Sequence, residues 1–98
     1  MKDNLKGVGV WGQGHYQYLK ENRPTTISVM RMKDALNSYL REVNDQADEM
    51  VFQLVKQLAK QEGVTEELKR RNQMAWVARM NNIRSRAEEV VLNDLVYA

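Results

Sequence analysis

Apolar residues recur every three or four positions over most of the chain from residue 36 onward. A first apolar seam consists of Leu36, Leu40, Val43, Ala47, Met50, Leu54 and Leu58, and a second of Trp76, Met80, Ile83, Ala87 and Val90. This spacing is typical of amphipathic helices that pack along one stripe. It predicts two long helices, over about residues 34–62 and 66–96.

The break between the two seams has the residues of a helix end followed by a helix start, QEGVTEE. Gly63 suits the left-handed conformation that ends a helix, and Thr65 can cap the helix that follows. Glu66 and Glu67 complement the positive N-terminus of that helix. A turn this short between two long helices predicts an antiparallel helical hairpin.

The first third of the chain is less regular. Residues 15–22 resemble a short helix, and Pro24 can begin another over about residues 24–33, because proline is tolerated in a first helical turn. That second helix either continues into the long helix or breaks from it at Asp34, a plausible N-cap. No alternating strand pattern is present, so the sequence predicts an all-α fold.

Four glycines precede the first predicted helix, and Gly7, Gly9 and Gly12 form the string G-x-G-x-x-G. A dinucleotide-binding site needs a strand before this string and another after the following helix. Only MKDNLK precedes it here, and the rest of the chain reads as helix. We interpret residues 1–14 as a flexible arm with Trp11 as its anchor, and residues 15–98 as one helical domain.

Several apolar residues lie off the two seams, among them Phe52, Val55 and Val77. A chain of 98 residues buries little core on its own, so these side chains need a cover. We expect both the N-terminal segment and a second copy of the chain to supply it, which predicts a homodimeric bundle.

Composition excludes several kinds of chemistry. The chain has no cysteine, and His15 is its single histidine, so neither a thiolate metal site nor a histidine-based catalytic set is indicated. We expect a protein that is not an enzyme and holds no cofactor or metal. Without an apolar run of about 18 residues or a signal peptide, we also expect it to be cytoplasmic and to have no membrane contact.

Charge is distributed unevenly along the chain. Residues 68–87 carry six basic residues and no acid, whereas residues 34–67 carry eight acids and three bases. Clustered arginine with interleaved asparagine is typical of a surface that binds nucleic acid or an acidic partner. The candidate contact residues are Lys69, Arg70, Arg71, Arg79, Asn82 and Arg86, with Lys20 and Arg23 nearer the N-terminus. An alternative surface for a protein partner consists of Glu42, Asp45, Asp48 and Glu49.

A structural interpretation of the same charges competes with both. With the hairpin centred at Gly63, Arg79 lies opposite Ala47 among acidic residues, and Arg84 lies opposite Glu42. Pairing between the two helices would then set their register, and each exposed pair would contribute only about 0–1 kcal/mol.

Two parts of the chain resemble the TnpV family of small transposon-encoded proteins. The C-terminal part is QEGVTEELKRRNQMAWVARMNNIRSRAEEVVLNDLVYA, and the N-terminal part contains WGQGHYQYLKENRP and ALNSYL. Family members usually have more residues before the Gly-Trp-Gly stretch, and often Ser-Gly where Lys33 and Asp34 stand here. The resemblance implies a setting in mobile elements of Gram-positive bacteria, beside site-specific recombinases. It does not imply a particular activity.

The sequence leaves three hypotheses for the function of the protein. The first is an accessory protein of a mobile element that binds nucleic acid, or a recombinase–DNA complex, through its basic helix face. The alternative is an anti-defence protein that binds and inhibits a host nuclease such as a CRISPR effector. In the third, the chain is a dimerisation module whose charges serve folding alone.

Overall fold

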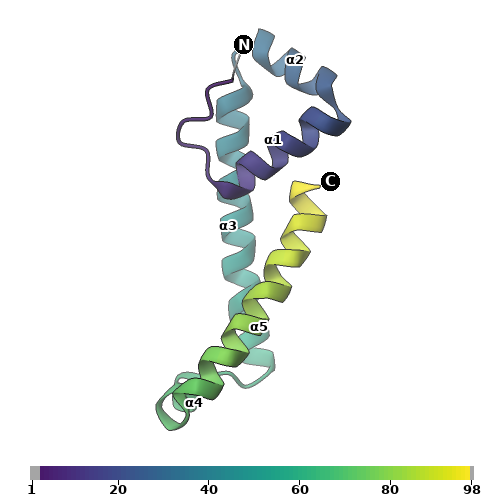
Figure 1. Cartoon of the computed structure of the whole chain (residues 1–98). Coiled ribbons are helices and arrows are strands. Elements are labelled where there is room, and N and C mark those ends of the chain that lie inside the picture. Colours follow the sequence, from purple (N-terminus) through teal and green to yellow (C-terminus); the bar gives the residue numbers. More distant parts are fainter. Residues whose placement is uncertain (1–2, 98) are drawn as a thin grey trace.

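The computed structural model describes residues 3–97, and its secondary structure there is entirely helical (Figure 1). The elements are α1 (Val10–Asn22), α2 (Pro24–Met32), α3 (Leu36–Gln61), α4 (Glu66–Arg71), α5 (Gln73–Val91) and a π-helical turn η1 (Leu92–Val96). The predicted all-α class is therefore confirmed.

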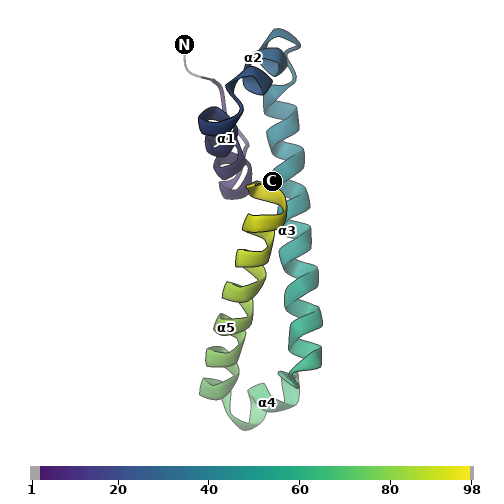
Figure 2. The same ribbon diagram turned by 90° about the vertical axis from the view of Figure 1, so that its right-hand side faces the viewer.

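The molecule is built along α3, its longest helix. One half of α3 is crossed by α1 and capped by α2, and α5 runs back along the other half in the opposite direction (Figures 1 and 2). The extents are 55 × 22 × 17 Å, and the radius of gyration is 17.1 Å. A compact domain of this length has a radius of gyration of about 13 Å, so the protein is a rod.

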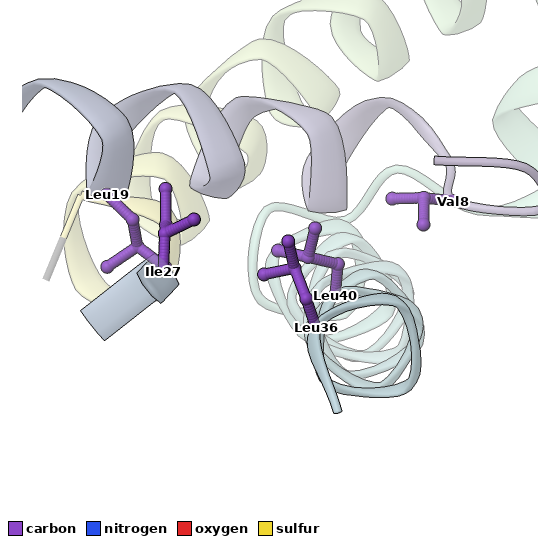
Figure 3. Close-up of a cluster of buried hydrophobic side chains, with 5 residues drawn as sticks. All are labelled: Val8, Leu19, Ile27, Leu36 and Leu40. Carbon is purple, nitrogen blue, oxygen red and sulfur yellow. The ribbon is translucent and has the colours of Figure 1, made fainter. Parts of the chain in front are cut away.

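The best-buried core lies at the α1–α2 end of the rod. A cluster of Val8, Leu19, Ile27, Leu36 and Leu40 joins α1, α2 and α3 there (Figure 3). Buried side chains continue along the α3–α5 contact as Val43, Ala47, Ile83, Ala87 and Val91. Closer to α4 the seam residues Leu54, Leu58, Trp76 and Met80 are only half-buried, because two helices alone cannot enclose them.

The glycine-rich segment is a packing element. Helix α1 begins at Val10, so the predicted boundary between arm and helix at residue 15 is wrong, and Gly12 and Gly14 are helical. The residues before α1 lie against α3: Val8 is 5% exposed, and the Asn37 side-chain amide donates to the Asn4 carbonyl at 2.9 Å.

Two glycines allow α1 to approach α3 closely. A Cβ at Gly12 would lie 2.5 Å from the Leu40 carbonyl oxygen, and one at Gly9 would lie 2.6 Å from Asn44 Oδ1. This proximity has a use, because Asn44 Oδ1 accepts a hydrogen bond from the Gly12 amide at 3.0 Å. The first turn of a helix leaves such amides without partners, so a side chain of α3 caps α1.

The breaks between helices differ from the prediction at two places. Residues 24–32 form a separate helix, which agrees with the predicted alternative of a break near Asp34. Asp34 itself does not cap α3, because it takes a positive φ of 54° and Ala35 occupies the cap. The helix predicted over 66–96 is broken at Asn72, whose backbone is extended and whose side chain accepts from the Ala75 amide at 3.1 Å. The Gly63 turn, with φ 71°, and the Thr65 cap are as predicted.

The break at Asn72 changes which residues of α3 and α5 lie near each other. Helix α4 lies across the end of the rod, so α5 begins only at Gln73 (Figure 2). Each residue of α3 therefore faces a residue of α5 that lies later in the sequence than a direct turn at Gly63 predicts. Arg86 contacts Glu62, and Arg84 lines a groove with Val51 and Val55 and is not placed opposite Glu42. The register predicted from a turn centred at Gly63 is wrong.

Substitution of Gly12 tests the close approach of the two helices. Gly12→Ala is expected to lower the free energy of unfolding by about 1–3 kcal/mol, because its methyl group would overlap the Leu40 carbonyl. Gly14→Ala is the matched control: its Cβ would make an ordinary contact 3.4 Å from Val96 Cγ1. Inside a helix alanine is favoured over glycine by about 1 kcal/mol, so Gly14→Ala is not expected to destabilise the fold. Urea unfolding followed by circular dichroism measures both, and equal destabilisation would contradict the packing role.

Candidate interaction surfaces

The basic residues of α4 and α5 form the first candidate surface. Arg70, Arg71, Arg79 and Asn82 are exposed. Arg79, Asn82 and Arg86 follow one another at helical spacing and line a strip beside the buried face of α5. Within residues 3–97, none of Arg70, Arg71 and Arg79 forms an ion pair. Their guanidinium groups are therefore available to a partner.

Two other members of the predicted basic set hold the end of the rod together. Lys69 is half-buried, with Nζ 4.7 Å from the centroid of the Trp76 ring, and so links α4 to α5 across the break. Arg86 Nη2 lies 2.7 Å from Glu62 Oε2 and links α5 to the end of α3. Both side chains of that pair are more than 40% exposed, so the pair contributes about 0–1 kcal/mol.

Lys20 and Arg23 are exposed but do not join this surface. They lie at and just beyond the C-terminal end of α1, whereas α4 lies at the opposite end of the rod (Figure 1). Lys20 Nζ is 6.0 Å from the centroid of the Tyr16 ring. The structure thus divides the predicted basic residues into two separate groups.

The acidic residues of α3 do not pair with α5. Glu42, Asp45, Asp48 and Glu49 are all exposed. Among the described residues the ion pairs are Arg31–Asp3 and Arg86–Glu62, neither of which involves these acids. The interpretation that they neutralise Arg79 and Arg84 is wrong, because the break at Asn72 shifts the register. The local partners of Asp48 and Glu49 are amides of their own helix, Asn44 and Gln53.

A polar cluster at the N-terminus was not apparent in the sequence. Asp3 accepts hydrogen bonds from Arg31 at 2.7 and 2.6 Å and from the Tyr16 hydroxyl at 2.7 Å. The Arg31 hydrogen bonds, reinforced by that of Tyr16, lower the pKa of Asp3 to about 2. The same contact raises the pKa of Arg31 and of Tyr16. No sequence spacing relates Asp3 to Arg31, since the contact depends on how the N-terminus packs.

His15 is part of the core. It is 4% exposed, with Nδ1 2.8 Å from the Val96 carbonyl oxygen and Nε2 2.7 Å from the Tyr39 hydroxyl. A carbonyl oxygen only accepts, so Nδ1 carries a proton, and in the neutral imidazole the Tyr39 hydroxyl donates to Nε2. Burial, with the charge of Glu42, raises the pKa of Tyr39. His15 thereby connects α1, α3 and the C-terminal π turn.

The last candidate surface is an apolar groove of about 650 Å³ between α1, α3 and α5, here called the central groove. Its lining is mainly apolar, with three charged residues. The lining residues are Val10, Trp11, Gly14, Asp48, Val51, Phe52, Val55, Arg84, Glu88, Leu92, Val96 and Tyr97. Within residues 3–97 no group of three or more histidine or carboxylate side chains could bind a metal ion.

Fold and surfaces together define a small, rod-shaped helical protein with an exposed basic surface and an apolar groove. The family model described as transposon-encoded protein TnpV matches residues 1–96, so the chain belongs to this family. No curated protein and no solved structure matches the chain significantly. None of the helices in residues 3–97 has the length and apolar character that a membrane crossing requires.

The Asp3–Arg31 contact predicts a measurable response to acid. Because the pKa of Asp3 is about 2 in the fold against an ordinary 3.8, its stabilisation is present above pH 4 and is lost as the pH falls from about 4 through 2. Asp3→Asn should flatten that part of the stability profile, measured by thermal unfolding across this pH range. Asp45→Asn, an exposed control, should keep the wild-type slope. An unchanged slope in Asp3→Asn would contradict the assignment.

Proposed function

We propose that this protein is a non-enzymatic accessory protein of a mobile element that binds nucleic acid, or a recombinase–DNA complex, through the basic surface of α4 and α5. Membership of a transposon-encoded family supplies the setting. The observation that carries the proposal is that Arg70, Arg71 and Arg79 are exposed and form no ion pair within the described residues.

Geometry supports contact with a phosphate backbone. Arg79 and Arg86 are seven residues apart on one face of α5, a rise of about 10 Å. Arg86 binds Glu62 through Nη2, which leaves its other guanidinium nitrogens to donate to a phosphate. Duplex DNA carries on the order of six phosphate charges over that length. Guanidinium groups donate two hydrogen bonds to a phosphate, and an interleaved amide such as Asn82 adds a neutral contact. The strip can therefore follow a backbone without reading bases.

Position on the rod also favours this surface. Arg70 and Arg71 lie on α4, which forms one end of the molecule (Figure 1). A charged tip can approach a large ligand without a clash from the rest of the chain. Of the acids at the same end, Glu62 is bound to Arg86, and Glu66 and Glu67 lie in the first turn of α4, before its basic last turn.

Salt-dependent binding to DNA tests the proposal. Binding of a fluorescent duplex, followed by anisotropy at about 50 and about 200 mM salt, should weaken steeply as salt rises. Arg70→Gln/Arg79→Gln should bind at least about tenfold more weakly and show a salt slope shallower by about 2. Its melting temperature should not change, because neither residue forms an ion pair within the described residues.

The control for that experiment removes two charges from the opposite end of the rod. Lys20→Gln/Arg23→Gln changes exposed residues at and just beyond the end of α1 and should keep wild-type affinity. No binding by the wild type, binding that ignores salt, or equal loss in the two variants would each overturn the proposal.

A second candidate function is supported by the acids of α3, which are exposed and form no ion pair within residues 3–97. An anti-defence protein could place Glu42, Asp45 and Glu49 on the basic nucleic-acid channel of a host nuclease. If this candidate is correct, the protein should capture a purified nuclease effector in the absence of DNA. Glu42→Gln/Glu49→Gln should then lose the complex, and Arg70→Gln/Arg79→Gln should keep it. The opposite pattern would exclude this candidate.

A further inference from the structure

Exposed apolar side chains gather around the central groove. Three large hydrophobic residues that remain exposed line it: Val10 is 83% exposed, Phe52 56% and Tyr97 49%. They belong to α1, to α3 and to the residue after the π turn, and so come from distant parts of the sequence. Between them the groove is hollow, with half-buried Trp11, Val51 and Val55 in its lining. A monomer keeps this apolar surface in water.

The groove carries charges of both signs. Asp48 projects from α3, and Arg84 and Glu88 lie one turn apart on α5. Within residues 3–97 none of the three forms an ion pair. In an interface with two-fold symmetry, residue i of one copy meets residue j of the other and the reverse. A groove that holds both Arg84 and carboxylates can therefore neutralise itself against its own copy.

Shape supports the same occupant. The groove lies near the middle of the rod, where α1 begins and α5 ends (Figure 1). Two rods that meet there can overlap across their 22 Å width along the central part of the 55 Å length, which leaves the α4 end free. A standard stable interface covers about 800 Å² on each partner, which such an overlap can supply. The exposed Phe52 and Val10 provide projections, and the groove of about 650 Å³ provides the space to receive them.

We propose that the central groove is the contact surface of a homodimer, in which each copy inserts exposed apolar side chains into the other and Arg84 pairs with Asp48 or Glu88 across the interface. The dimer covers the half-buried middle of the α3–α5 contact, which α1 leaves open. This interface does not involve Arg70, Arg71 or Arg79. It is therefore independent of whether the basic surface binds nucleic acid.

Sedimentation equilibrium of the whole chain over a micromolar concentration series tests the proposal. The wild type should be dimeric, and Phe52→Glu should weaken self-association at least about 30-fold, as expected for loss of an aromatic hot spot. Phe52 is more than half exposed, so this variant should fold, which circular dichroism checks. Met74→Glu, at a residue 85% exposed and remote from the groove lining, is the matched control and should remain dimeric.

Charge reversal identifies the pairing. Arg84→Glu should weaken the dimer, and the second change Asp48→Arg or Glu88→Arg should restore it if that residue is the partner. A monomeric wild type would overturn the proposal and leave the groove to another protein. A dimer that Phe52→Glu leaves intact, or that Met74→Glu disrupts equally, would overturn it as well.

Discussion

The close approach of α1 to α3 at Gly12 is the contact on which the rest of the structure depends. Because Gly9 and Gly12 have no Cβ, Asn44 reaches the Gly12 amide and caps α1 from a neighbouring helix. That contact aligns α1 so that Leu19 enters the core and His15 reaches Tyr39. It also places Val10 and Trp11 at the edge of the central groove. The absence of a Cβ at Gly9 and Gly12 therefore positions both the core and the apolar surface.

Much of the fold could be predicted from the sequence, because the α3 seam repeats without interruption and Gly63 and Thr65 carry local signals for a turn and a cap. The break at Asn72 could not be separated from a continuous helix by periodicity, since the residues around it are good helix formers. The only local signal was the asparagine itself, a residue type that favours N-caps. The glycines of residues 7–14 predict a flexible arm, and the close packing of Gly9 and Gly12 is evident only from their contacts with α3.

Which charged residues remain available on the surface depends more on the helix break at Asn72 than on the residue types. Charge counts identified the basic and acidic segments correctly, yet whether they pair depends on a register that one extra short helix shifts. Arg86 joins Glu62, while Arg79 and the acids of α3 stay unpaired within the described residues. The basic surface lies on α4 and α5 and the central groove between α1, α3 and α5, so the two surfaces have only α5 in common. One chain can then use α5 to contact a charged ligand while α3 and the start of α1 face another copy.

The hydrogen bond between His15 and Val96 spans 81 residues of sequence, far more than contacts within a helical hairpin. Helices form from local contacts, but closing a loop of this size costs entropy and slows folding. On the ribosome, α1 to α3 can assemble early, whereas the core around His15 stays incomplete until residue 96 has emerged. Loss of the π turn would leave the buried His15 Nδ1 without its acceptor, the Val96 carbonyl.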